Sequence, residues 1–288
     1  MTPPRAASDP ERPRTDRSGR AVTYTLFSKD RLTMNDTNKL KIGILGAGTI
    51  GKTLARKLAA AGHDVKVANS RGPETIDAET VATGAKAVTA AEAVQGVDVV
   101  ILSTPPTALI KIASLLATLP AETVVMDTSN YHPFRDGRIA AIDAGQVESL
   151  WVVEQLGRPI VKAWNSLVTD SLVNKGRPAG SPGRIALPVA ADRERDRRIG
   201  MRLVEDTGFD AVDAGTLAES WRQQPGAPSY CTDLTREELP AALASAERDR
   251  LAKRRNLATE VFLERFPNLG QEIPPADFVL RVHRTLFM

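Results

Sequence analysis

Three glycines at a defined spacing are the first residues of this sequence whose types and positions predict chemistry. The stretch GILGAGTIGKT, residues 43–53, contains Gly46, Gly48 and Gly51, which match the dinucleotide-binding pattern G-x-G-x-x-G. From Gly46 to Thr53 the same stretch also matches G-x-x-x-x-G-K-T, the pattern of nucleoside triphosphate-binding loops. Both patterns place a phosphate group at a helix N-terminus, where backbone N–H groups attract anions.

The two hypotheses use the surrounding residues differently. A triphosphate loop needs Lys52 on the phosphates, Thr53 on magnesium, and an acidic residue at a strand end, which Asp127 could supply. That hypothesis gives Gly48 no role. A dinucleotide site uses all three glycines, for a tight turn, for close approach of the pyrophosphate and for helix packing on the strand. Lys52 and Thr53 then begin the exposed side of the first helix.

The end of the second predicted strand favours the dinucleotide hypothesis. About 20 residues after the glycines, an acid selects NAD, whereas a cation accommodates the 2′-phosphate of NADP. Here Asn69, Ser70 and Arg71 replace the acid. Asn69 can bind the ribose, Ser70 offers a hydroxyl, and the planar guanidinium of Arg71 can pair with a phosphate. We therefore expect NADP(H) as the cofactor.

The elements that position these residues alternate between short apolar strands and helices. Strands are predicted at residues 40–46, 64–70, 85–88, 97–103 and 122–129, and helices at 49–62, 74–83, 90–94 and 107–119. This order predicts an α/β fold, a doubly wound parallel sheet of the Rossmann type.

Later segments predict a smaller C-terminal α/β part. It contains strands at residues 158–166, 184–190 and 209–215 and a helix at 192–206. The T-x-x-E pattern of Thr235 and Glu238 is a capping box, which predicts the start of a long C-terminal helix.

Composition and pattern divide the chain into four parts. Residues 1–37 are rich in Pro, Arg, Asp and Ser and predict a disordered tail, with Met34 as an alternative start. Residues 38–145 are assigned to the NADP-binding domain, 146–234 to a smaller substrate or closing domain, and 235–288 to a helical extension.

Charge and cysteine content exclude several classes of protein. The formal net charge is +3, and residues 1–36 hold seven Lys/Arg against five Asp/Glu, so the rest carries +1 and no nucleic-acid partner is expected. Without an apolar run of about 18 residues, no membrane association is expected. The single Cys231 allows no internal disulfide, and no spaced Cys/His set indicates a metal. We expect a cytoplasmic protein, and the sequence leaves a homodimer open.

Four stretches together resemble the NADP oxidoreductase family that depends on the deazaflavin coenzyme F420. They are residues 41–74, 99–106, 158–167 and 221–234. The sequence is also similar to the reductase part of the six-transmembrane metalloreductases, without their membrane half. The resemblance implies a Rossmann domain that binds NADP(H), a closing C-terminal part, and hydride transfer between the nicotinamide and a flavin-like ring.

The resemblance also implies roles for individual residues on the cofactor. Backbone N–H groups of Thr49, Ile50 and Gly51 would contact the diphosphate. The nicotinamide would lie against residues that follow the fourth strand, namely Ser103, Thr104 and Pro105.

Two further groups of residues follow from the same resemblance. Asn165 and Ser166 would form the floor below the acceptor ring and are the predicted catalytic residues. Ser70 and Arg71 would hold the 2′-phosphate. Thr75 stands where a second basic residue is expected, so the preference for NADP over NAD depends mainly on Arg71.

Several functions stay open at this level. The first is an NADPH-dependent reductase that transfers hydride between NADP(H) and a deazaflavin-type or other small acceptor. Alternatives are reduction of a free flavin, a ferric chelate or an imine, a non-catalytic NADP sensor, and a triphosphate-binding nucleotidase. His132 follows the fifth strand and is a candidate proton donor, although a role in ordering its loop is favoured.

Overall fold

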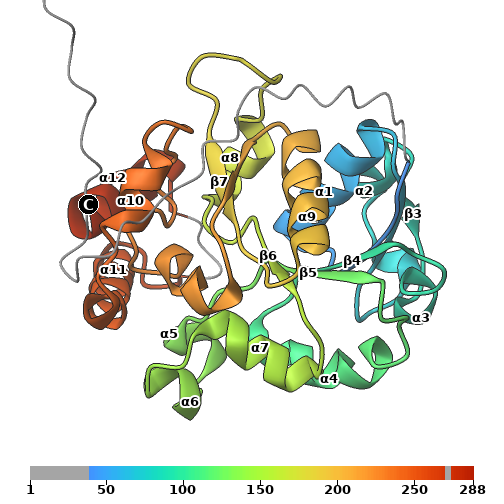
Figure 1. The fold of residues 1–288 in the computed structure, drawn as a ribbon, viewed down its shortest axis with the longest axis horizontal. Coiled ribbons are helices and arrows are strands. Elements are labelled where there is room, and N and C mark those ends of the chain that lie inside the picture. The colour runs from blue at the N-terminus through green and yellow to red at the C-terminus, as the bar shows by residue number, and fades with distance from the viewer. Residues whose placement is uncertain (1–38, 270–273) are drawn as a thin grey trace, which may run out of the picture. The chain divides into compact units, whose positions relative to one another are not determined.

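A six-stranded parallel sheet forms the centre of the described chain (Figure 1). The computed structural model describes residues 39–269 and 274–288, and the chain from Lys39 onward is one compact unit. Its strands are β1 (Lys41–Leu45), β2 (Asp64–Ala68), β3 (Lys86–Ala87), β4 (Val99–Leu102), β5 (Val124–Asp127) and β6 (Val161–Lys162). Their order, β3-β2-β1-β4-β5-β6, is that of the Rossmann fold, so the predicted fold class is confirmed. The predicted tail, residues 1–37, lies outside the described residues.

Helices cover both faces of the sheet (Figure 1). One layer comprises α1 (Thr49–Ala60), α8 (Thr169–Asn174) and α9 (Glu194–Asp206), and the other α3 (Ala90–Ala93), α4 (Pro106–Leu116) and α7 (Glu148–Leu156). Every residue of β4 and β5 is buried, as expected for strands that are covered on both faces. The continuous apolar runs of these strands therefore supply two apolar cores, one on each side of the sheet.

A two-stranded parallel sheet of β7 (Ala186–Val189) and β8 (Asp210–Asp213) forms the smaller part. An antiparallel bridge between Lys162 and Ala190 connects it to β6. The helix α9 packs on β6, β7 and β8. The predicted boundary near residue 145 stays a prediction.

The predicted helix at residues 74–83 is wrong. The segment instead forms a 3-10 turn, η1 (Pro73–Thr75), and a four-residue helix, α2 (Ala78–Val81). Between them Ile76 is extended, with φ −85° and ψ 125°. Polar contacts of Thr75 with Asn69 and Gly72 fold this segment back onto the end of β2, which interrupts the helix.

The C-terminal residues form several helices. The capping pair is present, because the Glu238 carboxylate accepts from the Thr235 N–H at 2.8 Å, but the helix after it, α10 (Leu239–Ala244), is short. The long helix is α11 (Leu251–Arg265), which precedes α12 (Ala276–Phe287). The remaining elements are α5 (Pro133–Asp136), α6 (Ala140–Asp143), η2 (Leu217–Gln223) and η3 (Arg248–Arg250).

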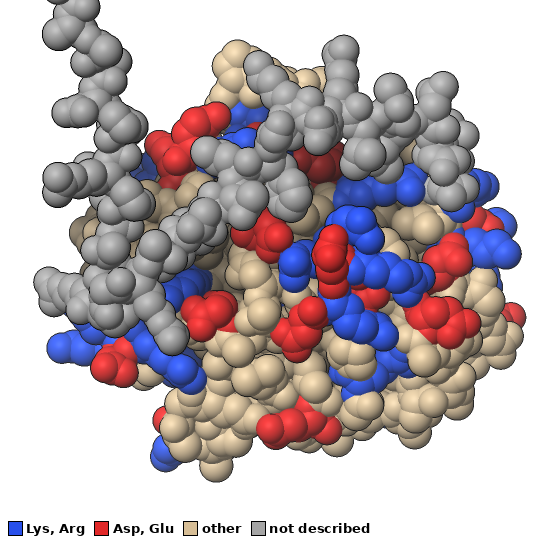
Figure 2. Space-filling view, viewed as in Figure 1, with Lys and Arg blue, Asp and Glu red and all other residues tan. Residues whose placement is uncertain are grey.

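Charged side chains of both signs alternate around α9 on the face drawn in Figure 2. Arg193 pairs with Asp196, and Arg197 lies 3.0 Å from Asp213. Most of the charge-rich run DRERDRR is therefore exposed and its charges largely balance, but the expectation that the whole run is solvated is wrong for Asp196, which is buried and pairs with Arg193. Among the described residues no helix is both long and apolar enough to span a bilayer.

Candidate functional site

The turn between β1 and α1 brings helix and sheet into very close contact. Gly46 has a φ of 110°, and a Cβ on it would lie 2.1 Å from the Ser103 carbonyl oxygen, so no other residue fits. A Cβ on Gly51 would lie 1.8 Å from the Gly46 carbonyl oxygen. These two glycines hold α1 against the ends of β1 and β4. The sheet order reverses between those two strands, which is where doubly wound folds bind ligands.

Gly48 differs from its two neighbours in the pattern. Its φ of −72° suits any residue, and a Cβ there would meet nothing within 4 Å. The space that this Cβ would enter lies at the N-terminus of α1. The turn therefore leaves open the space that a pyrophosphate requires, here called the cradle.

The start of α1 offers backbone donors to that cradle. The first backbone hydrogen bond of the helix joins Lys52 N to Gly48 O at 2.9 Å, so the N–H groups of Thr49, Ile50 and Gly51 precede the helical ladder. Gly48 provides no side-chain cap, and the first turn has no acidic side chain. The residues present thus fit an anionic phosphate at this position.

The contacts of Thr53 and Asp127 argue against the triphosphate hypothesis. The expectation that Thr53 is exposed is wrong, because the residue is 5% exposed and its hydroxyl donates to Thr49 O at 2.7 Å. The Asp127 carboxylate is fully buried and lies 2.6 Å from Lys162 Nζ. Neither group is left to hold a magnesium ion. No cluster of three metal-ligating residues occurs in residues 39–269 and 274–288.

Asn69 shapes the loop at the end of β2. Its Oδ1 accepts from the N–H groups of Arg71 and Gly72, at 2.9 and 3.0 Å. Its Nδ2 donates to Thr75 Oγ1 at 2.8 Å, and that hydroxyl donates to Gly72 O. Thr75 therefore acts by fixing the loop where a second cation was expected. A contact of Asn69 with a ribose stays a prediction.

Ser70 and Arg71 are exposed at the tip of this loop. The ion pairs formed by the described residues do not include Arg71, so its guanidinium has no competing carboxylate. An unpaired guanidinium beside the adenosine end of a dinucleotide fold fits the 2′-phosphate of NADP.

A cavity of about 460 Å³ opens at the carboxyl ends of the strands. It brings together five of the residues that the sequence assigned to the cofactor or catalysis: Ile50, Ser103, Thr104, Pro105 and Asn165. Ser166 is buried beside Asn165 but does not line the cavity, and its carbonyl accepts from Cys231 N at 2.8 Å. Its catalytic role stays a prediction.

Asn165 is bound on both sides of its amide. Its Nδ2 donates to Asn130 Oδ1 at 3.1 Å and to Gln223 O at 2.8 Å, and its Oδ1 accepts from Gln223 Nε2 at 2.8 Å. Both amide hydrogens are therefore used within the protein. This arrangement fixes the floor of the cavity, and direct contact of Asn165 with an acceptor stays a prediction.

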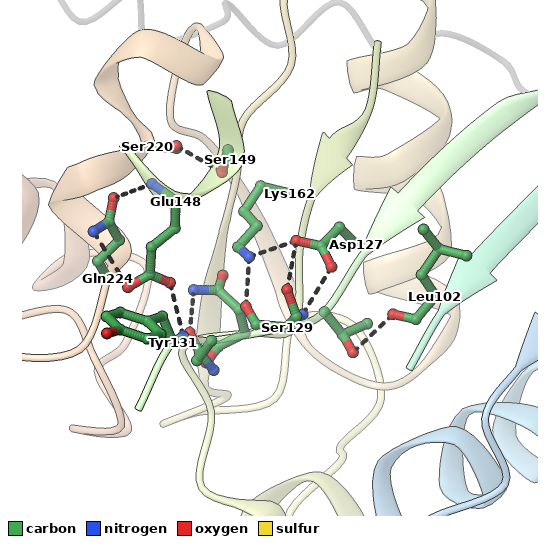
Figure 3. A network of polar contacts seen from close by, with 12 residues as sticks. Leu102, Asp127, Ser129, Tyr131, Glu148, Ser149, Lys162, Ser220 and Gln224 are labelled. Atoms are coloured by element: carbon green, nitrogen blue, oxygen red, sulfur yellow. Dashed lines mark hydrogen bonds and ion pairs between the residues drawn. The ribbon is translucent and has the colours of Figure 1, made fainter. Parts of the chain in front are cut away.

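A buried polar network supports this floor (Figure 3). Lys162 pairs with Asp127 and donates to Ser129 O, and the Asp127 carboxylate accepts from the Ser129 N–H at 3.0 Å. Beyond it, the Glu148 carboxylate accepts from Tyr131 N at 3.1 Å and from Gln224 Nε2 at 3.3 Å. The loop after β5 is thereby held by charged groups on β6 and α7.

Two histidines and a tyrosine on the cavity wall are uncharged at neutral pH. Burial, together with the nearby charges of Arg135 and Arg255, lowers the pKa of His132 to about 3. Burial lowers the pKa of His283 to about 4 and raises that of Tyr230 well above its ordinary value. His132 Nε2 lies 3.3 Å from the Tyr230 hydroxyl. These groups suit orientation of a ligand better than proton exchange near pH 7.

One wall of the cavity was not predicted from the sequence. It is formed by side chains of α11 and α12, including Arg255, Thr259, Phe262, Val279, His283 and Phe287. The strongly amphipathic pattern of α12 indicates a buried face. No pattern along the chain says that this face covers the ends of β4 and β5.

Comparison with known proteins gives the family. The model of the family described as NADP oxidoreductase, coenzyme F420-dependent, matches residues 41–131, which include the glycine turn, the β2 loop and Ser103 to Pro105. A hypothetical protein from Sinorhizobium meliloti, known from its crystal structure, is 31% identical with a TM-score of 0.59. That match covers 68% of this chain and 96% of that protein. Residues 41–131 of this chain therefore match the F420-dependent NADP oxidoreductase family.

Curated relatives match shorter segments. Glyoxylate/hydroxypyruvate reductase A from Yersinia enterocolitica is 38% identical over 114 residues, which are 38% of this chain and 36% of the relative. The Escherichia coli K12 protein YjhV is 56% identical over 63 residues, which are 22% of this chain and 46% of the relative. The chain thus spans less than half the length of these curated relatives.

Substitutions at Gly48 and Gly51 separate an effect on NADPH binding from an effect on the free energy of unfolding. We expect Gly48→Ala to leave the unfolding free energy within about 0.5 kcal/mol of wild type, because a Cβ meets no atom there. It should weaken NADPH binding, since the methyl group enters the cradle. Gly51→Ala should cost at least about 1–3 kcal/mol, because its Cβ collides with backbone. Urea unfolding and calorimetric titration with NADPH measure both effects, and an unchanged NADPH affinity of Gly48→Ala would contradict the cradle.

The raised pKa of Glu148 predicts a specific dependence of stability on pH. Burial raises its pKa from 4.5 to about 7, against the opposing charges of Lys162 and Arg255. The folded chain then holds a proton that the unfolded chain loses, so stability from this group falls as pH rises from 4.5 to 7. We expect the wild type to lose about 3 kcal/mol relative to Glu148→Gln across this window. Urea unfolding of both proteins at pH 5 and pH 8 tests this, and parallel pH curves would contradict it.

Proposed function

We propose that the protein is an NADP(H)-dependent oxidoreductase that transfers hydride between the nicotinamide and a small acceptor in the cavity. The observation that carries the proposal is the alignment of three features along one edge of the sheet. These are the empty cradle at Gly48, the unpaired guanidinium of Arg71, and the cavity beside Ser103, Thr104 and Pro105. Their order matches the diphosphate, the adenosine phosphate and the nicotinamide of one dinucleotide.

The chain's own residues would bind and orient the reactants. The backbone N–H groups of Thr49, Ile50 and Gly51 would donate to the diphosphate, and Arg71 would pair with the 2′-phosphate. When bound, NADP(H) supplies or accepts the hydride at its nicotinamide ring. The walls of the cavity would exclude water and hold the nicotinamide and the acceptor next to each other in a fixed orientation. Such alignment is the main requirement of hydride transfer.

The chemistry of the cavity supports an acceptor that takes hydride without a strong acid beside it. His132, His283 and Tyr230 line the cavity, and each keeps its neutral form at pH 7. A deazaflavin-type ring, as in the description of the family, is the first candidate for the acceptor. A free flavin, a ferric chelate and an imine are the alternatives. A cytoplasmic location and a homodimer stay predictions.

Arg71→Ala tests the assignment of NADP. We expect the variant to lose NADPH affinity by about 10- to 100-fold, the range of a charge-assisted contact of ~1.5–3 kcal/mol, with little change for NADH. Calorimetric titration with both cofactors gives the two constants. Lys52→Ala is the matched control, since it removes a cation in the first turn of α1 that the triphosphate hypothesis requires. Equal losses for NADPH and NADH in Arg71→Ala would refute the assignment.

A panel of acceptors tests the reaction. We expect NADPH-loaded protein to be oxidised by the deazaflavin coenzyme faster than by free flavin, ferric chelate or a cyclic imine, followed by nicotinamide absorbance. The Gly48→Ala variant serves as a control with a folded chain and a blocked cradle. No oxidation by any acceptor, with NADPH still bound, would favour a sensor over an enzyme.

A further inference from the structure

Arg255 on α11 is a buried cation without a carboxylate partner. The residue is 8% exposed and lines the cavity. Its guanidinium lies over the ring of Tyr131, with 5.1 Å between Cζ and the ring centroid. Its Nε donates to Asn256 Oδ1 at 3.1 Å, a neutral acceptor. Within the described chain no acceptor is paired with its two terminal nitrogens.

A buried charge of this kind is costly unless something neutralises it. The acidic groups nearby are already engaged. Asp143 pairs with Arg138 and Tyr131, and Asp127 pairs with Lys162. Glu148 accepts from Tyr131 N and Gln224, and burial keeps it partly protonated near neutral pH. The positive charge of Arg255 therefore persists at the wall of the cavity.

The other charged groups on the cavity wall do not compensate for it. Arg135 is neutralised by Asp136, with 2.7 and 2.8 Å between their nitrogen and oxygen atoms. Asp170 is exposed and accepts from Asn174 Nδ2 at 2.8 Å. Since the histidines and Tyr230 are neutral, the described residues of the cavity wall offer Arg255 as one positive charge outside any ion pair, on a wall that is mostly apolar.

We propose that the acceptor bound in this cavity carries a carboxylate, which pairs with the two terminal nitrogens of Arg255. The planar guanidinium matches a carboxylate through two parallel hydrogen bonds. The side chains of Phe134, Phe262 and Val279 around it would contact an apolar or aromatic body. The proposal deepens the proposed function, on which it rests, by naming the chemical class of the acceptor.

A singly charged group fits better than a phosphate dianion. Arg255 supplies one positive charge, and the nearby Glu148 carboxylate carries part of a negative charge that would repel a second one. A single carboxylate balances the local charge without a further cation. The helix that provides Arg255 lies outside residues 41–131, so this specificity is separate from the cofactor motifs.

Benzoate and benzamide are the probes for the test. They share size and an aromatic ring and differ in charge. We expect the full-length wild type to bind benzoate about tenfold or more tightly than benzamide, by calorimetric titration. The fluorescence of Trp164, which lines the cavity, offers a second readout. Equal affinity for the two probes overturns the proposal, as does tighter binding of phenyl phosphate than of benzoate.

Variants of Arg255 and Lys253 test whether Arg255 causes the preference for benzoate. Arg255→Met removes the guanidinium but keeps an unbranched apolar side chain that can pack on Tyr131, and it should abolish the preference for benzoate. Lys253→Met, an exposed cation on the same helix, should retain it. If Arg255→Met does not fold, Arg255→Lys replaces it, and this variant should lower the preference by losing the paired geometry. A preference unchanged in the folded Arg255 variant overturns the proposal.

Titration with NADPH separates this proposal from the proposed function. Arg255→Met should bind NADPH as the wild type does, since Arg255 lies on the acceptor side. A wild type that prefers benzoate but does not bind NADPH would refute the proposed function alone. A wild type that binds NADPH but treats the two probes alike would refute the carboxylate alone.

Discussion

The close contact of α1 with the ends of β1 and β4 is the constraint on which the site depends. It exists because Gly46 and Gly51 have no side chains where backbone atoms approach within the reach of a Cβ. This contact directs the N-terminus of α1 at the point where the strand order reverses. The backbone donors of the helix, the open space over Gly48 and the residues after β4 then lie along one edge, as a dinucleotide site requires.

A second constraint fixes the loop after β5. The buried pair of Lys162 and Asp127 ties the ends of β6 and β5 together, and Glu148 holds the backbone of Tyr131 from α7 (Figure 3). Breaking such a pair leaves an uncompensated buried charge, which is strongly destabilising. The same loop carries Asn130 and His132 into the cavity, so its conformation determines the shape of the acceptor site.

The C-terminal helices form one wall of the cavity. The helices α11 and α12 bring Arg255 and an aromatic wall to the edge of the Rossmann sheet, although they follow β5 by more than a hundred residues. The family motifs in residues 41–131 contain the cofactor features, whereas the acceptor wall comes from outside them. In the proposed function, the residues for the cofactor and those for the acceptor would therefore lie on separate segments of the chain.

The sequence by itself determined five strands of the sheet, the glycine turn and the residues at the end of β2, because each depends on local patterns: strand apolarity, glycine spacing and the residues at a strand end. It assigned the strand at 158–166 to the smaller part, whereas β6 pairs with β5 in the main sheet. It could not reveal that Thr75 interrupts a helix by a hydrogen bond to Asn69, or that the side-chain amide of Asn165 is hydrogen-bonded to Gln223. The contact of Asn165 and the ion pair of Lys162 join residues that lie far apart in the sequence. The contact of Thr75 and the position of Arg255 depend on side-chain directions that no sequence pattern encodes. Only the tertiary structure decided them, because the pairing and the energetic cost of a buried charge depend on the groups that surround it in space.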